Sequence, residues 1–216
     1  MNYHKKAKII FFLLLSITLL SCGSVPLNLQ IAKKNVIKYY ESSAYSNDLE
    51  NIISNAEDEI NNIKLKTNSV VIFDIDETSL SNYENIKEIY FGYDSLKWDN
   101  WINEAKAPAI PEVKKFYDYA ISKKIKVVFL SSRKSSQYDA TNRNLKHAGY
   151  LEFDTLILKD NSVSNQSSSE FKSKKRELLT QKGYEIIADI GDQASDLVGK
   201  FTGIQIKLPN YLYIIE

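Results

Sequence analysis

Two aspartates end a run of apolar residues in the first half of the chain. Residues 70–73 are Val-Val-Ile-Phe, and Asp74 and Asp76 follow at a spacing of two. An unpaired carboxylate in a protein core is energetically costly, and two neighbouring carboxylates also repel each other. A divalent cation or a shared proton is the usual way to hold such a pair. The two aspartates therefore indicate a site of chemistry.

Cleavage of a phosphate ester is one reaction that such a pair can carry out. Asp74 can attack phosphorus, while Asp76 can protonate the leaving oxygen and later activate water. Because a carboxylate nucleophile repels a phosphate dianion, the site also needs positive charge. Mg²⁺ bound by Asp74 and Asp192 would supply part of that charge, and a lysine would supply the rest. The Ser131 hydroxyl can donate a hydrogen bond to a phosphoryl oxygen.

Five short β-branched runs, separated by helical patterns, must position these residues. The runs cover residues 70–75, 125–130, 155–158, 185–190 and 204–208. Continuous apolar strands that alternate with helices predict an α/β fold with a parallel sheet covered on both faces. In such sheets, ligands bind at the carboxyl ends of the strands. Asp74 and Asp76 end the first run, Ser131 and Arg133 end the second, and Asp192 follows the fourth.

Two segments interrupt this alternation. Residues 79–110 are rich in aromatic side chains, which favours a structured insertion over a loose loop. Residues 161–169 are rich in Ser and Asn and indicate a surface loop. After this loop, a helix is expected from about residue 173 to residue 182, where Gly183 would end it.

The aromatic side chains of the insertion allow two interpretations. Tyr83, Trp98 and Trp101 either pack the core of a small cap or form a wall against the leaving group of a substrate. Residue order alone does not choose between them.

Four motifs, in this order, resemble those of the haloacid dehalogenase (HAD) superfamily. They are Phe-Asp-Ile-Asp-Glu-Thr at 73–78, Phe-Leu-Ser-Ser-Arg at 129–133, Phe-Lys-Ser-Lys-Lys-Arg at 171–176 and Gly-Asp-Gln-Ala-Ser-Asp at 191–196. They are similar to motifs of the exported acid phosphatases of class B and class C type (HAD subfamily IIIB), a branch that includes plant vegetative storage proteins. The resemblance covers about residues 68–208. It implies a Rossmann-like core with five parallel strands in the order 5-4-1-2-3, helices on both faces and a small cap insertion.

The resemblance also implies roles for the acidic residues. Asp74 matches the nucleophile, and Asp76 matches the general acid and base, which would also offer its main-chain carbonyl to Mg²⁺. Asp192 matches a metal ligand, and Asp196 matches the second acid of the fourth motif, either a ligand or a support for one. Thr78 would brace the loop after the first strand.

The phosphate-binding groups follow from the second and third motifs. The resemblance implies that Ser131 provides the phosphate-binding hydroxyl and that Lys172 provides the phosphate-binding ammonium, with Lys174 and Lys175 as nearby alternatives. Arg133 has two open roles, since it can approach the phosphate or pair with an acid near the site.

Simpler interpretations stand beside these roles. Asp-x-Asp at a strand end can be a solvated turn, Gly-Asp-x-x-x-Asp can be a helix cap, and Glu77 is expected to be a solvated acid or a helix-start residue.

The function expected is a metal-dependent phosphomonoesterase that acts on small esters, with nucleotides as one candidate class. The alternative is a non-catalytic phospho-ligand-binding or storage lipoprotein on the same fold. An aspartate retained at position 74 favours the enzyme.

The N-terminal residues 1–21 are typical of a secretory signal. Three lysines precede an apolar run at residues 9–20, which is shorter than the roughly 20 residues that span a bilayer. The sequence Leu-Leu-Ser-Cys at 19–22 resembles a bacterial lipobox, in which Cys22 becomes the lipidated first residue. A free thiol after an ordinary signal, or an uncleaved anchor, is the alternative.

These observations give an expected organisation. Residues 22–30 would be a lipid tether, residues 31–66 N-terminal helices, and residues 67–216 a phosphatase core. The protein would be exported and anchored by lipid to a bacterial membrane, on its periplasmic or cell-surface face. Its expected partners are a small phosphomonoester and the membrane. The net charge of +1 gives no strong attraction for a nucleic acid polymer.

Overall fold

The computed structural model describes residues 27–215, so the predicted signal at 1–21 and the lipidation site Cys22 lie outside the described residues. None of the described helices has both the length and the apolar character needed to cross a bilayer.

The strands are β1 (Ser69–Phe73), β2 (Lys126–Lys134), β3 (Thr155–Lys159), β4 (Glu185–Gly191) and β5 (Ile204–Lys207). The helices are α1 (Leu29–Glu41), α2 (Ser43–Asn61), α3 (Tyr83–Glu88), α4 (Ser95–Glu104), α5 (Pro111–Ser122), α6 (Tyr138–His147), α7 (Ser168–Gln181) and α8 (Ala194–Leu197), with 3₁₀ turns at Ser135–Gln137 and Asn161–Val163.

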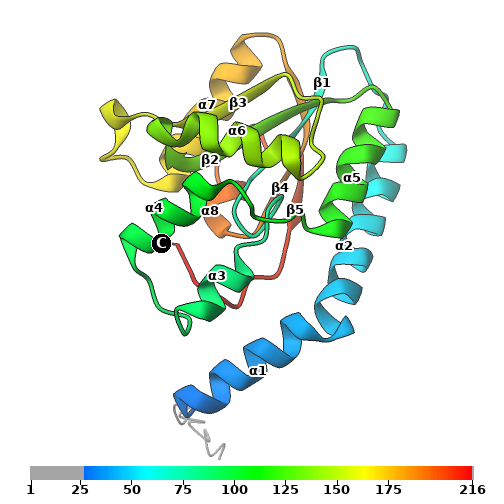
Figure 1. The fold of residues 1–216 in the computed structure, drawn as a ribbon. Coiled ribbons are helices and arrows are strands. Elements are labelled where there is room, and N and C mark those ends of the chain that lie inside the picture. The colour runs from blue at the N-terminus through cyan, green and yellow to red at the C-terminus, as the bar shows by residue number, and fades with distance from the viewer. Residues whose placement is uncertain (1–26, 216) are drawn as a thin grey trace, which may run out of the picture.

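The strands form one parallel sheet in the order β3-β2-β1-β4-β5, which confirms the predicted α/β fold and strand order (Figure 1). At its carboxyl end, β1 pairs Phe73 with Phe129 of β2 and with Ile190 of β4. The strand order therefore places Asp74 at the centre of the carboxyl edge, between the ends of β2 and β4.

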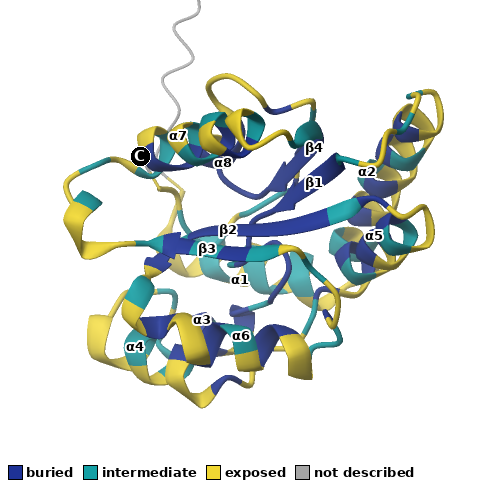
Figure 2. Ribbon diagram, turned by 90° about the horizontal axis from the view of Figure 1, so that it is seen from above, coloured by how far each residue is buried: buried dark blue, intermediate teal, exposed yellow. Residues whose placement is uncertain are grey.

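Both faces of the sheet are covered, as Figure 2 shows. Side chains alternate along a strand, so successive residues of β1 enter different cores. Val71 and Phe73 pack in the larger core with α2 and α5, whereas Val70 and Ile72 pack against α7. β1 is buried along its whole length. This central strand thus gives Asp74 a rigid base.

α7 begins at Ser168, so the helix expected from residue 173 starts five residues earlier than predicted. Ser167 caps it, because its hydroxyl accepts the backbone N–H of Glu170 while the Glu170 carboxylate accepts the backbone N–H of Ser167. The predicted surface loop at 161–169 therefore ends in the first turn of this helix. The early start places Lys172 on the helix itself.

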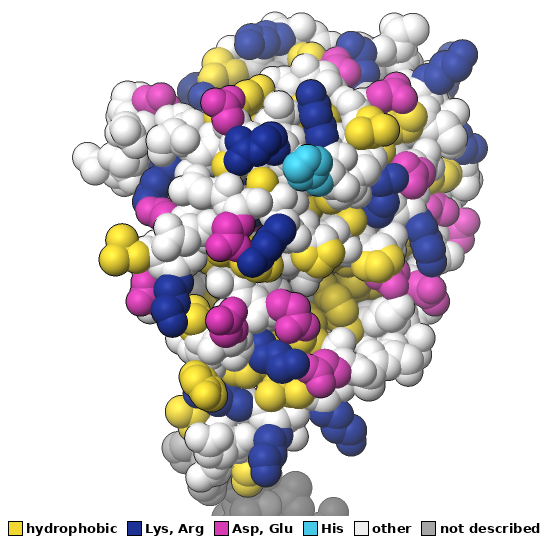
Figure 3. Space-filling model, viewed as in Figure 1, with side chains coloured by type: hydrophobic (Ala, Val, Ile, Leu, Met, Phe, Trp, Pro, Cys, Tyr) yellow, Lys and Arg dark blue, Asp and Glu magenta, His cyan; other side chains and the backbone are white. Residues whose placement is uncertain are grey.

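The insertion at residues 79–110 contains α3 and α4, and α4 packs against α6. On the face of the molecule in Figure 3, acidic and basic side chains are intermingled, with no continuous basic surface. This pattern agrees with the near-zero net charge of the sequence.

Candidate active site

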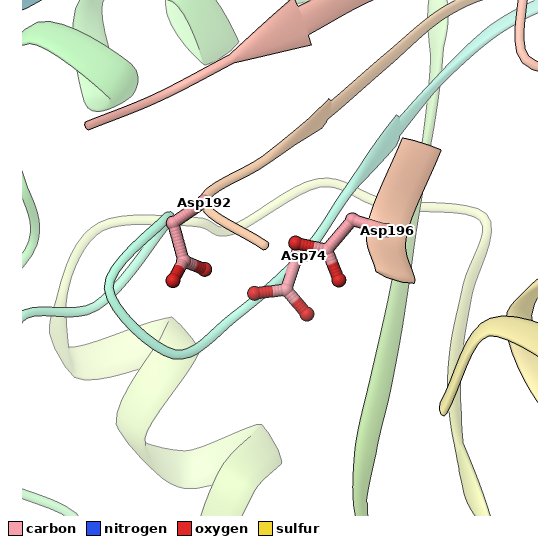
Figure 4. A group of neighbouring side chains, drawn as sticks. All are labelled: Asp74, Asp192 and Asp196. Carbon is pink, nitrogen blue, oxygen red and sulfur yellow. The ribbon is translucent and has the colours of Figure 1, made fainter. Parts of the chain in front are cut away.

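Three carboxylates from separate parts of the chain meet at the carboxyl edge of the sheet. Asp74 follows β1, Asp192 follows β4 and Asp196 lies on α8 (Figure 4). Each of the three side chains is buried. One carboxylate oxygen from each lies within 4.8 Å of the others. Gly191 makes this approach possible, because a Cβ there would lie 2.3 Å from a carboxylate oxygen of Asp196.

Lys172 is the lysine that reaches this cluster. Its buried Nζ donates to Asp196 Oδ1 at 2.6 Å and also to Asp74 Oδ1. The two alternatives lie outside, since Lys174 pairs with Glu177 at the surface and Lys175 lies over the Phe171 ring. Of the three lysines of the motif, the first is therefore the one that α7 turns toward the carboxylates.

The cluster holds more negative than positive charge. Burial is the largest cause that raises the pKa of Asp192 to about 7, and the neighbouring carboxylate of Asp196 is the second. Burial raises the pKa of Asp74 well above its usual range, although Lys172 acts in the opposite direction. Burial alone would lower the pKa of Lys172, but the carboxylates of Asp74 and Asp196 outweigh it and raise that pKa.

These residues fit a divalent cation. With all three acids ionised, the Lys172 ammonium, which pairs with Asp74 and Asp196, balances one of the three negative charges in this buried place. Carboxylate oxygens are the ligands that hard cations such as Mg²⁺ prefer. The donor set and its charge therefore suit one such ion.

Asp76 faces a different partner from Asp74. Arg133 donates from Nε to Asp76 Oδ2 at 3.0 Å and from Nη2 to Oδ1 at 2.6 Å, and Asn82 Nδ2 donates to Oδ1 at 2.9 Å. Arg133 is buried, and its Nη1 donates to Thr141. Of the two open roles for Arg133, this structure shows pairing with an acid.

Ser131 lies within β2, which runs on to Lys134 and not to residue 130 as the sequence predicts, and Thr78 lies in the loop after β1. Ser131 is buried at the cavity wall, and its hydroxyl accepts the backbone N–H of Arg133 at 3.2 Å. The Thr78 hydroxyl donates to Asp192 Oδ1 at 3.1 Å. Thr78 therefore joins the loop after β1 to the loop after β4.

Glu77 corrects the expectation of a solvated acid. It is buried, its backbone adopts a left-handed φ of 53°, and its carboxylate accepts from the Asn82 backbone and from Tyr213 Oη at 2.7 and 2.6 Å. Burial raises its pKa to about 7. Sequence reasoning missed this residue because its partner Tyr213 is distant in the chain.

The three aromatic residues singled out in the insertion do not share one role. Trp98 lines a cavity of about 520 Å³ above the carboxylates. Tyr83 instead stacks on Tyr40 of α1, and Trp101 Nε1 donates to Asn82 Oδ1 at 2.7 Å, so both support the insertion. Neither Tyr83 nor Trp101 is among the described residues that line the cavity.

Sequence reasoning missed most of the cavity wall. Its further apolar members come from the insertion and from the C-terminal segment: Ile86, Ile89, Phe91, Tyr93, Leu212, Tyr213, Ile214 and Ile215. The many aromatic residues of the insertion were a usable signal, whereas the C-terminal residues carried none. The site therefore combines a charged floor with an apolar rim.

Comparison with known proteins shows which family this chain resembles along its length. Residues 8–216 match the family described as HAD superfamily, subfamily IIIB (Acid phosphatase). The stem 28 kDa glycoprotein of Glycine max is 36% identical over 185 residues, covering 83% of this chain and 73% of the relative. Acid phosphatase 1 of Solanum lycopersicum is 33% identical over 150 residues, covering 68% of this chain and 59% of the relative.

A solved structure supports the same assignment. The class C acid phosphatase from Bacillus anthracis aligns with a TM-score of 0.72 and 25% identity, covering 86% of this chain and 85% of that one. The family match spans nearly the whole chain, and the structural match includes the sheet that carries the carboxylates.

Proposed function

Because the chain belongs to the acid phosphatase family, subfamily IIIB of the HAD superfamily, we propose that it is a metal-dependent phosphomonoesterase. One observation carries this proposal: Asp74 lies at the floor of the cavity with Lys172 on one oxygen and two further buried acids beside it. That arrangement supplies a nucleophile, a fixed positive charge and the ligands for a cation.

The first half of the reaction forms a phosphoryl-enzyme. Asp74 Oδ1 is held by Lys172, which leaves Oδ2 to attack phosphorus. Asp76 enters this step protonated. As the new bond forms, the bond from phosphorus to the ester oxygen breaks and Asp76 gives its proton to that oxygen, so that an alcohol leaves. Ser131 and Lys172 are the proposed donors to the phosphoryl oxygens.

The second half releases phosphate. Asp76 takes a proton from a water molecule, the water oxygen attacks phosphorus, and the bond to Asp74 breaks. Inorganic phosphate leaves, and both carboxyl groups return to their starting state. Arg133 holds the Asp76 carboxylate through two nitrogens, so the same group faces the ester oxygen and then the water.

Asp74, Asp192 and the main-chain carbonyl of Asp76 are the proposed ligands of Mg²⁺, with Asp196 beside them. When bound, the cation would neutralise charge on the phosphoryl group and on the acids. It would also remove the repulsion between a carboxylate nucleophile and a phosphate dianion.

The apolar rim bears on the substrate. Phe91, Tyr93 and Trp98 lie above the charged floor, so the leaving group of a small monoester would contact aromatic rings. Aryl phosphates and nucleoside monophosphates are the candidate classes that this rim favours over sugar phosphates. Measuring phosphate release from these three classes, with Mg²⁺ and with chelator, tests the proposal. Equal release with chelator would contradict the metal dependence.

We also propose that the protein is exported and anchored by a lipid on Cys22. The support is the sequence alone, namely a basic and apolar leader at 1–21 and the lipobox-like residues 19–22. Mass spectrometry of the mature N-terminus tests this point. An unmodified Cys22 thiol would contradict it.

A further inference from the structure

The last described residues of the chain return to the site. After β5, residues 209–215 have no regular secondary structure, and we call them the C-terminal strap. Figure 1 shows the strap in red, leaving β5 on its way to the C-terminus. Four strap residues, 212–215, line the cavity above the carboxylates. The strap is therefore a wall of the site.

The strap also contacts the proposed metal ligand Asp192. Asn210 Nδ2 donates to Asp192 Oδ2 at 2.6 Å, and Gln193 Nε2 donates to the same oxygen at 2.5 Å. The other oxygen, Oδ1, accepts from Thr78. Two amides thus hold one oxygen of the carboxylate and fix the direction of the other.

The backbone of the strap orients both amides. The Leu212 N–H donates to Asn210 Oδ1 at 2.7 Å, and the Ile215 N–H donates to Gln193 Oε1 at 3.0 Å. An amide whose oxygen accepts a backbone N–H must turn its NH₂ the other way. In each case that direction is toward Asp192. The strap therefore determines which atoms face the carboxylate.

Contacts at other points hold the strap in place. The Tyr213 hydroxyl donates to the buried Glu77, and the Tyr211 N–H donates to the Tyr40 hydroxyl at 3.2 Å. Tyr40 in turn stacks on Tyr83 with the ring centroids 5.1 Å apart. The strap is thus tied both to the loop after β1 and to α1.

We propose that Asn210 is a positioning residue, which orients Asp192 for the cation, and that the C-terminal strap is the element that fixes Asn210. This inference rests on the proposed function, because it concerns the same metal site. Partners that hydrogen-bond a metal ligand typically change metal affinity about 10- to 100-fold when they are removed. Asn210 is expected to act on cation binding more than on the chemical step.

The test is Mg²⁺ binding without substrate, measured by isothermal titration calorimetry on the wild type and on Asn210→Ala. We expect an affinity about 10- to 100-fold weaker in the variant. Phosphate release should then need correspondingly more Mg²⁺, while kcat at saturating Mg²⁺ stays within about threefold, a change below 1 kcal/mol. The matched control is Asn165→Ala, because Asn165 is exposed on a loop and is not among the described residues that line the cavity.

A purely structural role predicts a different pattern, namely a lower melting temperature with unchanged Mg²⁺ affinity, and that result would overturn the inference. If Asn210→Ala does not fold, two other variants give the same comparison. Asn210→Ser keeps a polar group on a shorter side chain, and Tyr213→Phe removes one anchor of the strap. Unchanged affinity in both would be equally decisive against it. A wild type that binds Mg²⁺ but hydrolyses nothing would refute the proposed function and leave the calorimetric test of Asn210 intact. A wild type that binds no Mg²⁺ would refute this inference and the metal dependence together.

Discussion

Arg133 and Asp76 form a two-nitrogen ion pair, with distances of 3.0 Å from Nε and 2.6 Å from Nη2. The Arg133 side chain is 2% exposed and the Asp76 side chain 17% exposed, so the pair lies at the boundary between core and cavity. A guanidinium that grips a carboxylate through two parallel bonds fixes its plane as well as its position. Asp76 therefore faces the cavity in one orientation, which suits its proposed role in proton transfer in both half-reactions.

Asp76→Asn should slow hydrolysis in a way that depends on the leaving group. An alkyl oxygen must be protonated as it leaves, whereas a nitrophenolate leaves without a proton. We expect a loss of kcat of about 10²- to 10⁴-fold on an alkyl phosphate. A clearly smaller loss is expected for formation of the phosphoryl-enzyme from nitrophenyl phosphate. Burst kinetics on the two substrates measure the difference, and equal losses would argue against Asp76 as the general acid.

Mg²⁺ should stabilise the folded protein. At a concentration of one hundred times Kd, a ligand that binds only the folded state adds about 2.7 kcal/mol. For a chain of this size that corresponds to a rise in melting temperature of roughly 5–11 °C. Thermal unfolding with Mg²⁺ and with chelator checks this value. Identical melting temperatures would mean that the three carboxylates do not hold the ion.

The pH dependence of the metal-free protein follows from Asp192. Its pKa is raised to about 7 in the folded state, against about 3.9 in an unfolded chain. Between these values the folded protein retains a proton that the unfolded chain has lost, so stability falls as pH rises through this window. Glu77, with a folded pKa of about 7, acts in the same direction.

Bound Mg²⁺ should oppose this trend, because the proposed site takes the ion on ionised carboxylates. The stabilisation by Mg²⁺ should therefore increase as pH rises toward and through about 7. Denaturant titrations at pH 5 and pH 8, each with Mg²⁺ and with chelator, measure both effects. A Mg²⁺ effect that is larger at pH 5 would contradict the assignment.

Lys172→Met should destabilise the protein strongly when no metal is present. Removing one partner of a buried ion pair costs about 3–5 kcal/mol, and here two buried acids, Asp74 and Asp196, would lose the ammonium that pairs with both. Lys174→Met is the matched control, since Lys174 forms an exposed pair with Glu177 and such pairs contribute at most about 1 kcal/mol. Urea unfolding of the two variants gives the comparison. Similar stabilities for the two would show that Lys172 does not balance the site.

Trp98 and Trp101 should respond differently to substitution by alanine. Trp98 lines the cavity, so Trp98→Ala should raise KM for an aryl phosphate with a smaller change in kcat. Trp101 donates to Asn82, which in turn donates to Asp76. Trp101→Ala should therefore lower kcat for all substrates. Steady-state kinetics on an aryl and a sugar phosphate distinguish these outcomes, and the reverse pattern would refute the assignment.

The sequence predicts the sheet well, and it also predicts the polar residues at the carboxyl ends of the strands, because both depend on local patterns. Asp74 and Asp192 follow buried strands, and parallel strands bring such ends together. The Lys172 assignment needed the resemblance as well as the local pattern, because three lysines lie within four positions and the local pattern does not show which of them faces the carboxylates. The helix that carries Lys172 starts at Ser168, five residues earlier than the sequence predicts. That start depends on the Ser167 cap, which the loop-like composition of 161–169 obscured.

Contacts between distant segments account for what the sequence did not predict. The local sequence around Glu77 predicts a solvent-exposed acid. In the structure, the hydroxyl of Tyr213, far along the chain, donates a hydrogen bond to the buried Glu77 carboxylate. Asn210 lies in an irregular segment with no recognisable motif, and only the fold brings it to Asp192. Such pairs have no periodicity or fixed spacing to reveal them.

The most direct test of the account is phosphate release by Asp74→Asn beside the wild type, with Mg²⁺ present. Asp58→Asn, at an exposed position on α2, is the control. The proposed nucleophile predicts a fall in kcat of at least about 1,000-fold, equivalent to roughly 4 kcal/mol, for a folded Asp74→Asn protein. The wild type and the control should remain active and share a phosphoryl-enzyme that the variant does not form. A folded Asp74→Asn protein with wild-type activity would contradict the mechanism, and a folded, Mg²⁺-binding wild type without activity would favour a binding or storage role instead.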